Sequence, residues 1–351
     1  MLIFSLVGCV GNFFITHTSI IILLRGCYLT IKPIIFYWSL CQYDFDWSDF
    51  RILMKPFLTV FPLIFLSYVC DIVYAPFRKS IGIVAQAESI RLGIRCLAGF
   101  FNRFTHAILF GLIYYAYFRY YYTGRFRKIN EWFSVFMVIS ALKVKDLFGF
   151  IFGNSFFLFR RFKTVHILVV SVIICIAFAA YAYFMPEHYN QYINVDDDTT
   201  TARVALNVTS LKIAADHFPF GVGHGTFASP TSRQTHSEVY YQYEIDHIYG
   251  LSFERDGGCF MCDTFWPMII GETGFLGLCL YLLIFYYVFK DYLIGAFRDT
   301  SDKRFIFPAL LFLIFLPTSF GKPVFNGPSH CYVVWGFAGF FYSLKNKKYH
   351  S

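Results

Sequence analysis

The chain has 351 residues, of which 57% are hydrophobic, 22% aromatic and only 15% charged. One water-soluble core could not hide this much apolar surface, so the composition excludes an ordinary soluble protein and predicts an integral membrane protein. The net charge of +8 is spread among short loops and is not gathered in one patch, which argues against nucleic acid as a partner.

Apolar segments in chain order predict an all-α membrane protein with about ten transmembrane helices. The segments are residues 2–24, 30–41, 52–70, 97–120, 131–142, 147–160, 165–184, 266–289, 304–320 and 329–344. The first segment lacks a basic leader and is therefore expected to be an uncleaved span. The sequence KVKD separates 131–142 from 147–160. Two crossings joined by a charged loop cost less free energy than one long span that buries these lysines in the membrane, so two crossings are predicted.

Basic clusters predict the side on which each loop lies. The clusters are RFRK at 125–128, RRFK at 160–163, the run 298–304 and KNKK at 345–348. They fall on one common side, which the positive-inside tendency assigns to the cytoplasm. The protein is then expected to be a multi-pass protein of the inner (cytoplasmic) membrane with both chain ends inside.

Three parts of the chain follow from this topology. They are N-terminal helices in 1–184 with a small outer loop at 71–96, a large extracytoplasmic loop at 185–262, and C-terminal helices in 263–351. The loop at 185–262 is the one long polar segment of the sequence, so chemistry is expected there.

The large outer loop contains a predicted amphipathic helix over 201–215 that ends near Asp216 and Pro219. Its apolar face is expected to hold residues at helical spacing, namely Val204, Val208, Leu211 and Ala215.

The predicted helix is followed by a turn, DHFPFGVGHGTF at 216–227, which contains Gly221, Gly223 and Gly225. These glycines allow a tight turn or a close approach to a ligand. A G-x-G-x-G turn that follows a helix and has no strand before it argues against a nucleotide site, and a purely structural turn is the alternative.

A second distinctive stretch, DTFWPMIIGETGFLG at 263–277, leads into the next apolar segment. Asp263 and Gly274 are about three helical turns apart, so they would share one face of a helix. Glu272 lies well inside an apolar segment, where an ionisable residue usually faces a cavity or a partner. A structural ion pair with a lysine or arginine of another span is the alternative.

Together the two stretches resemble the O-antigen ligase and polysaccharide polymerase superfamily. Members run an arginine, a helix, a Pro with GxGxG and Phe, and then His-Asn or Asp-Asn before Glu-x-Gly-x-x-Gly. Arg203 stands at the position of that arginine, and RCLAGFFNRFTHA at 95–107 is similar to the family's arginine followed by Gly-Phe at the opening of a span. The resemblance covers about residues 91–290. Asp263 stands where ligases have His, which counts against a ligase.

The resemblance implies a GT-C-like membrane glycosyltransferase that polymerises polyprenyl-diphosphate-linked oligosaccharide repeats by inverting transfer on the outer face. Cations would hold the diphosphate leaving group. The candidates are Arg203 and Arg95, assisted by Arg91, Lys143 and Lys145, although the family usually has arginine where these two lysines stand. The base that takes the acceptor proton would be Asp263, then His224, then Glu272.

No metal or other cofactor is expected, because arginines can hold a diphosphate. The carboxylates of Asp196, Asp197 and Asp198 keep a Mg²⁺ or Ca²⁺ site open as an alternative to an acidic loop that caps the next helix. Cys259 and Cys262 are expected to form either an extracytoplasmic disulfide or two free thiols.

Three other functions stay open: a ligase that transfers polysaccharide to a lipid core, a flippase for lipid-linked oligosaccharides, and a membrane-anchored binding protein. A transporter would carry charges along many spans and show related halves. The candidate residues gather instead at one outer face, which favours the enzyme. Its expected partners are the lipid bilayer and the polyprenyl-diphosphate-linked oligosaccharide, and a flippase and a chain-length regulator are candidate protein partners.

Overall fold

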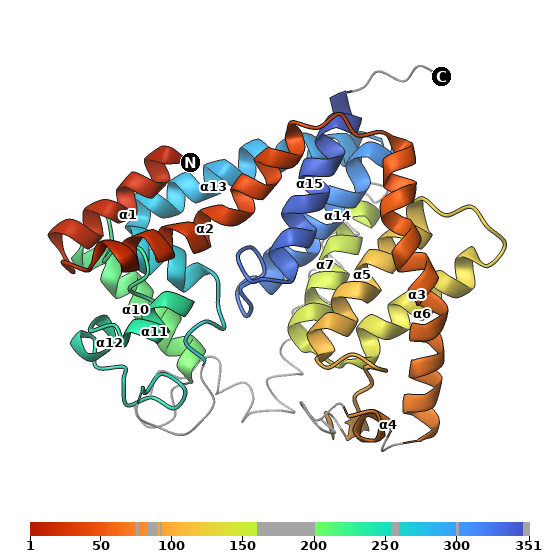
Figure 1. Ribbon diagram of the computed structural model, residues 1–351, viewed down its shortest axis with the longest axis horizontal. Helices are drawn as coiled ribbons and strands as arrows, with labels where there is room; N and C mark the ends of the chain where they lie inside the picture. The colour runs from red at the N-terminus through yellow and green to blue at the C-terminus, as the bar shows by residue number, and fades with distance from the viewer. Residues whose placement is uncertain are drawn as a thin grey trace. The chain divides into compact units, whose positions relative to one another are not determined.

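A computed structural model describes residues 1–74, 77–82, 90–91, 93–159, 201–253, 260–299 and 302–346. These residues are mostly helical, because thirteen helices hold 71% of them (Figure 1). The β structure among them is one antiparallel pair, β1 (Ile90–Arg91) with β2 (Ile94–Arg95), in which Ile90 is opposite Arg95. The predicted all-α class is confirmed.

Three helices are long and apolar enough to cross a membrane: α2 (Ile20–Cys41), α3 (Trp47–Val73) and α13 (Trp266–Arg298). Their most apolar windows are only 33%, 28% and 50% buried, so much of their apolar surface faces outward. In water such a surface would be unfavourable, whereas lipid tails solvate it. The protein is therefore an all-α membrane protein.

The chain divides into two compact units. Unit 1 contains Met1–Ile35, Leu158–Lys290 and Ser319–Gly327, and unit 2 contains Phe36–Phe157, Asp291–Thr318 and Pro328–Ser351.

In unit 1, α1 (Leu2–Phe14), the first part of α2 and the first part of α13 lie beside three helices of the predicted outer loop (Figure 1). These three are α10 (Ala202–Asp216), α11 (Pro230–Thr235) and α12 (Val239–Gln242). Phe265 and Tyr281 belong to an aromatic core with Phe285 and Phe325, and the Trp266 indole N–H donates to Ser319 Oγ at 2.7 Å.

The predicted single span at 2–24 is wrong, because the chain turns between α1 and α2. Thr16 and Thr18 use their side chains in this turn: Thr16 Oγ1 donates to the Val222 carbonyl at 2.9 Å, and Thr18 Oγ1 accepts from Asn12 Nδ2 at 2.6 Å. Residue His17 has a positive φ of 48°, which no helix continues. α2 then runs through the predicted gap before residue 30 and ends at Cys41.

In unit 2, α5 (Phe104–Tyr120) is almost wholly buried and packs against α6 (Arg127–Ser140) and α14 (Lys303–Thr318). α14 also packs against α15 (His330–Asn346), and α7 (Val144–Phe159) lies close to α14, with Gly149 beside the Ile314 carbonyl (Figure 1). Small residues allow such close backbone approach between membrane helices.

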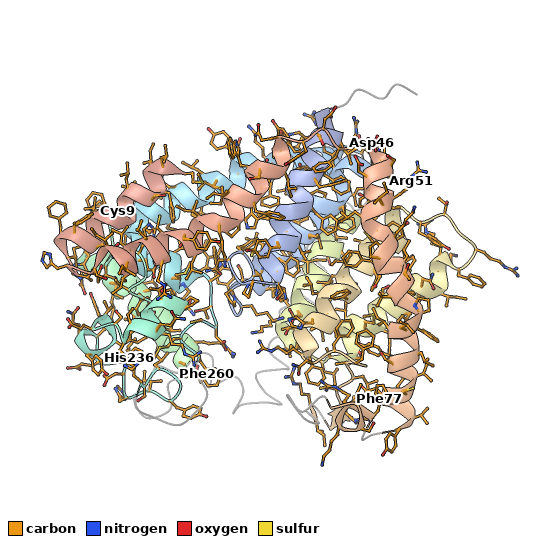
Figure 2. All side chains as sticks on the ribbon, in the orientation of Figure 1. Cys9, Asp46, Arg51, Phe77, His236 and Phe260 are labelled. Atoms are coloured by element: carbon orange, nitrogen blue, oxygen red, sulfur yellow. The ribbon has the colours of Figure 1, made fainter. Side chains whose placement is uncertain are left out.

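Helix boundaries in unit 2 agree with several predicted segments. α6 and α7 are separate helices on either side of the KVKD sequence, as expected. The N-cap of α3 is Asp46, whose Oδ1 accepts the N–H groups of Ser48 and Asp49 in a capping box (Figure 2). A single turn, α4 (Phe77–Ser80), follows α3. The predicted span 165–184 lies outside the described residues.

Candidate functional site

The glycine-rich turn and the GETG sequence bind each other directly. α13 is not continuous, because Gly274 has φ 63° and ψ −165° and breaks the helix near its start. At this break the carbonyls of Gly271 and Glu272 accept the N–H groups of Val222 at 3.0 Å and Gly223 at 2.9 Å. The Pro219 carbonyl in turn accepts the Leu276 N–H at 3.2 Å. The turn therefore satisfies backbone groups that the broken helix leaves without helical partners.

Two glycines make this contact possible. A Cβ on Gly221 would lie 2.5 Å from the Gly271 carbonyl oxygen, and a Cβ on Gly274 would lie 2.3 Å from the Pro219 carbonyl oxygen. Both residues have positive φ, and the conformation of Gly274 is open essentially to glycine alone. On the other side of the turn, Gly223 and Gly225 lie against the backbones of Asn12 and Ile22. In this structure the glycines thus form a structural turn, which was the alternative to a ligand-binding turn.

Asn12 of α1 fixes the turn from its other side. The side chain is fully buried; its Oδ1 accepts the His224 N–H at 2.7 Å, and its Nδ2 donates to the His224 carbonyl at 2.9 Å. The sequence analysis missed this residue, which lies 212 positions before its partner. The available signal was a carboxamide inside an apolar segment, since polar residues in such segments usually have a specific partner.

The side chains of His224, a residue of the turn, and of Glu272 are both buried, with 0% and 1% of their surface exposed. His224 Nδ1 is 3.8 Å from Glu272 Oε2, and Glu272 Oε1 accepts the Phe227 N–H at 3.3 Å. Neither ring nitrogen of His224 makes a hydrogen bond within the described residues. Glu272 thus faces a partner as expected, but the partner is a histidine and not a lysine or arginine. Their burial suits support of the turn, and their role as bases stays a prediction.

Tyr240 of α12 holds the end of the turn. Its hydroxyl accepts the Ala228 N–H at 3.0 Å, and its ring stacks on Phe227 with the centroids 5.5 Å apart. Burial raises the pKa of the Tyr240 hydroxyl, so the group stays protonated and neutral at physiological pH.

Arg203 and Asp263 form an ion pair at the partly exposed side of unit 1. Arg203 Nη2 donates to Asp263 Oδ2 at 2.8 Å, and the two side chains are 30% and 38% exposed. Asp263 Oδ1 accepts no hydrogen bond from the described part of the chain. The structure therefore brings together the first candidate for diphosphate binding and the first candidate base.

Local structure places both members of the pair. Arg203 belongs to the first turn of α10, where its carbonyl accepts from Asn207 Nδ2 at 2.8 Å. Asp263 lies before α13, which begins at Trp266, so Asp263 is not the N-cap of that helix. The expectation that Asp263 and Gly274 share a helix face is also wrong, because one residue precedes the helix and the other breaks it.

The helix over 201–215 is confirmed as α10, and of its predicted apolar face Val204 is buried while other residues are exposed. Leu211 is 52% exposed and Ala215 is exposed, whereas Leu206 and Ile213 are fully buried. Ser210 faces inward as well, which is tolerated because its hydroxyl donates to the Asn207 carbonyl at 2.7 Å.

The other cationic candidates, which include Lys143, lie in unit 2, and other groups of the protein contact each of them. Arg95 binds Asp71 at the end of α3, at 2.6 Å to Oδ1 and 2.7 Å to the carbonyl. Arg91 donates to the Leu142 carbonyl at 3.3 Å, just past the end of α6, where a cation is favourable. Lys145 is half-buried in the first turn of α7. Diphosphate binding by these four residues stays a prediction.

Arg78 of α4 is a further buried cation that the sequence analysis did not select. It donates to the Phe101 carbonyl at 2.9 Å and lies over the Phe104 ring at 4.9 Å from the centroid. These contacts give it a structural role in the loop that precedes α5.

Metal and thiol predictions fall partly outside the described residues. Asp196, Asp197, Asp198 and Cys259 are among those outside, and Cys262 is half-buried. Within the described ranges, no group of three or more His, Cys, Asp or Glu side chains is placed to hold a metal ion.

No family model matches the chain, and no curated protein matches it significantly. The superfamily resemblance therefore rests on the sequence motifs alone.

Proposed function

We propose that the chain is a membrane glycosyltransferase that polymerises polyprenyl-diphosphate-linked oligosaccharide repeats into surface polysaccharide. The observation that carries the proposal is the Arg203–Asp263 ion pair, which is joined at 2.8 Å and partly exposed. It combines a cation suited to a diphosphate with a carboxylate suited to an acceptor proton, on two motifs that run in the order of the family.

The proposed reaction assigns one role to each residue. The acceptor hydroxyl oxygen attacks the anomeric carbon, the bond from that carbon to the diphosphate oxygen breaks, and the hydroxyl proton moves to the Asp263 carboxylate. Arg203 stabilises the charge that develops on the departing diphosphate. A guanidinium has five N–H donors, so Arg203 can contact a phosphate oxygen while one N–H still holds Asp263.

The buried junction supports this site. α10 ends at Asp216 directly before the glycine-rich turn, and the turn is fixed in the break of α13, which Asp263 precedes. Arg203 thus lies on the helix that leads into the turn, and Asp263 lies just before the broken helix to which the turn is hydrogen-bonded. Catalytic groups act best when packing fixes their geometry in advance, which the buried contacts of the turn supply.

The finer architecture belongs to the same proposal: about ten spans, a GT-C-like arrangement in the inner membrane, and residues 185–262 on the outer face. The alternation of basic clusters supports this arrangement. Arg91, Arg95 and Lys145 are proposed as secondary contacts for the diphosphate, since cations outside the cytoplasm run against the positive-inside tendency.

The proposal is tested with the purified full chain in lipid nanodiscs, supplied with polyprenyl-diphosphate oligosaccharide and analysed by glycan gel. The parent should extend the oligosaccharide, and Asp263→Asn should lower the rate by about 10²- to 10⁴-fold because it removes the proton acceptor while keeping the side-chain size. Asp246→Asn, a carboxylate of the same region outside the pair, is the control and should extend at the parental rate. Parental extension by Asp263→Asn would exclude Asp263 as the base.

A deletion strain separates the proposed polymerase from its alternatives. Single repeats on the cell surface indicate loss of a polymerase, long chains that are not transferred to a lipid core indicate loss of a ligase, and repeats retained inside indicate loss of a flippase. Either of the last two patterns would contradict the proposal.

A further inference from the structure

α3 is long enough to end in the headgroup layer of the bilayer. It has 27 residues and is therefore about 40 Å long. The hydrocarbon layer is about 30 Å thick and the bilayer with its headgroups about 40–45 Å thick, so a helix of this length that crosses the membrane ends among the headgroups. The loop that precedes α5 is fixed at the same depth, because Asp71 Oδ2 accepts the N–H groups of Ala98 and Gly99, each at 3.0 Å.

This end of unit 2 carries a surplus of positive charge. Among the described residues from Asp71 to Arg103, five side chains are lysine or arginine and one is a carboxylate. The carboxylate of Asp71 is already paired with Arg95 at 2.6 Å. The remaining cations repel one another, so an anion from outside the chain would stabilise this region.

Arg78 of α4 has no acidic partner although it is buried. The residue is 8% exposed, and its Nη2 donates to the carbonyls of Phe101 at 2.9 Å and Asn102 at 3.3 Å. Its Nε is buried and makes no hydrogen bond, and no carboxylate in the described part of the chain pairs with the guanidinium. Burial of a charge without an opposite charge is unfavourable, and the cation–π contact with Phe104 compensates only part of it.

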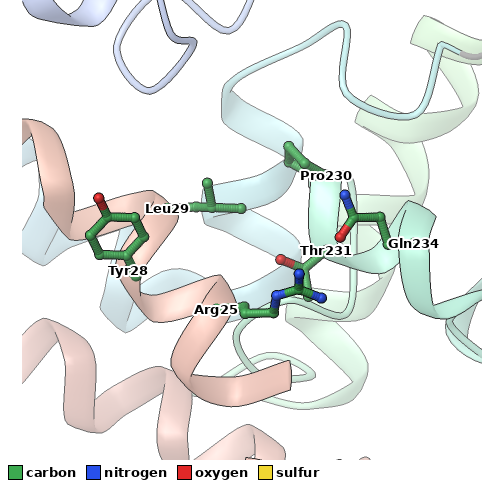
Figure 3. Close-up of a pocket in the computed structure, with 6 residues that line it drawn as sticks. All are labelled: Arg25, Tyr28, Leu29, Pro230, Thr231 and Gln234. Carbon is green, nitrogen blue, oxygen red and sulfur yellow. The ribbon is translucent and has the colours of Figure 1, made fainter. Parts of the chain in front are cut away.

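Burial distinguishes Arg78 from the exposed arginines of the protein. Arg25, for example, lines an open and mostly apolar pocket between α2 and α11 and is exposed, so its guanidinium can stay hydrated (Figure 3). Arg78 lacks that compensation, and an anion bound at the adjacent surface would supply it.

The surface beside Arg78 combines cations with apolar side chains. Arg103 follows the second carbonyl that Arg78 binds, Lys79 follows Arg78 in α4, and both are exposed. α4 packs against the end of α3, where Val73 and Tyr74 are 80% and 53% exposed. At headgroup depth, such apolar side chains contact acyl chains and cations contact lipid phosphates.

The chemistry of this surface selects one class of lipid. A zwitterionic phospholipid carries its own cation and would leave the surplus charge in place, and a free anion would leave the apolar side chains uncovered. We propose that the end of α3, α4 and the loop before α5 bind the phosphate of an anionic phospholipid, in which Arg103 and Lys79 contact the phosphate and its charge compensates Arg78. This inference does not depend on the reaction proposed for Arg203 and Asp263.

Site-specific labelling tests the inference. The full chain in phosphatidylcholine nanodiscs receives a trace of photoreactive phosphatidylglycerol or of the matching photoreactive phosphatidylcholine, and mass spectrometry locates the labelled peptides. The phosphatidylglycerol probe should label residues 73–81 and 96–103 about fivefold more than the phosphatidylcholine probe does. Arg103→Gln should reduce that labelling about fivefold, because one cation near a lipid phosphate contributes about this factor in affinity.

Two controls show whether the loss is local. Labelling at the basic cluster 125–128 should be the same in the parent and in Arg103→Gln. Lys212→Gln, which removes an exposed cation of α10, should be labelled at 73–81 and 96–103 as the parent is. Arg78→Gln should lose labelling as Arg103→Gln does, and if the buried position prevents Arg78→Gln from folding, the exposed Arg103→Gln decides.

Three results would overturn the site: equal labelling by the two probes, parental labelling of Arg103→Gln, and an equal loss in Lys212→Gln. Competition then separates the sources of the phosphate. Excess unlabelled phosphatidylglycerol should remove the labelling, and glycerol phosphate should not. Removal by glycerol phosphate would indicate a site for a free phosphate, and removal by polyprenyl diphosphate at a concentration where phosphatidylglycerol has no effect would indicate the donor substrate; either result would contradict the proposal.

Discussion

Arg203 and Asp263 lie sixty positions apart in the chain and meet at 2.8 Å. The ion pair places the cation proposed to bind the diphosphate beside the carboxylate proposed to accept the proton. The guanidinium holds the carboxylate at one oxygen, and the second oxygen accepts no hydrogen bond from the described residues.

The guanidinium geometry of Arg203 is predicted to matter beyond its charge. Arg203→Ala should abolish chain extension, and Arg203→Lys should retain little of it, because a lysine cannot contact the phosphate and Asp263 with one rigid fork. Extension of lipid-linked oligosaccharide by the purified variants measures this, with Lys212→Ala on the exposed side of α10 as the control. Full activity of the lysine variant would reduce the requirement to charge alone, and full activity of the alanine variant would remove Arg203 from the site.

Glu272 is predicted to support the turn through one oxygen. Glu272→Ala leaves the buried Phe227 N–H without its acceptor, which should lower the free energy of unfolding by about 1–3 kcal/mol. Glu272→Gln keeps an acceptor oxygen at the same place and should lose less. The thermal unfolding midpoint in detergent reports the difference. Equal midpoints for both variants would mean that this hydrogen bond contributes nothing.

The motif resemblance selected Arg203 and Asp263, because Arg203 stands at the position of the family's arginine and Asp263 stands where ligases have His. It could not select Asn12, because its partner is a backbone segment 212 residues later and contacts of that kind leave no local pattern. It also could not reveal that His224 and Glu272 are buried, since both could equally have faced an open cavity.

At the scale of elements, the break in α13 is the feature that organises unit 1. Apolar periodicity predicted a helix from 266 but not its interruption, because membrane helices tolerate glycine and the pattern does not show which glycine leaves the helical conformation. The interruption becomes favourable through the turn that fills it, which is a tertiary effect.

The break is predicted to require glycine at 274. Gly274→Ala places a Cβ 2.3 Å from the Pro219 carbonyl oxygen and forces alanine into a conformation that costs about 1–3 kcal/mol for the backbone alone. The unfolding midpoint and the chain-extension rate should both fall. Cys279→Ala, at an exposed position of the same helix, should change both much less. Similar losses for the two variants would show that the break is not specific to residue 274.

The turn between α1 and α2 was not predicted, and the inward-facing residues of α10 are only partly those of its predicted apolar face, for a shared physical reason. In a chain this apolar, hydropathy marks a helix but does not distinguish a face in contact with protein from a face in contact with lipid. The hydroxyl groups of Thr16 and Thr18 could have bound water or other protein groups. Their hydrogen bonds to Val222 and Asn12, which stabilise the turn, cannot be read from the sequence. Leu211 could face inward by hydropathy, yet Ser210 and Ile213 do so instead.

At the scale of the whole molecule, helix content and membrane character followed from composition, and three apolar helices agree with them. The division into two units did not follow from the sequence, because each unit is assembled from three separate stretches of chain. The side on which each loop lies depends on the membrane and is best measured directly.

Topology is predicted to place Gln234 outside and Lys290 inside the cytoplasmic membrane. Alkaline phosphatase fused after Gln234 should be active, because that enzyme needs the oxidising exterior, and the same reporter after Lys290 should be inactive. A fusion at Arg125, in a basic cluster, is the cytoplasmic control. Equal activity at Gln234 and Lys290 would refute the proposed arrangement.

The contact between Asn12 and His224 has a consequence for how the chain is made. α1 is synthesised well before the turn, so the Asn12 carboxamide is at first without the His224 backbone groups that it binds in the folded protein. That partner leaves the ribosome only after more than half of the chain has been translated, and the break that receives the turn follows later still. α1 therefore reaches its final contacts only after the turn and the break have both been synthesised, and assembly of unit 1 is completed late.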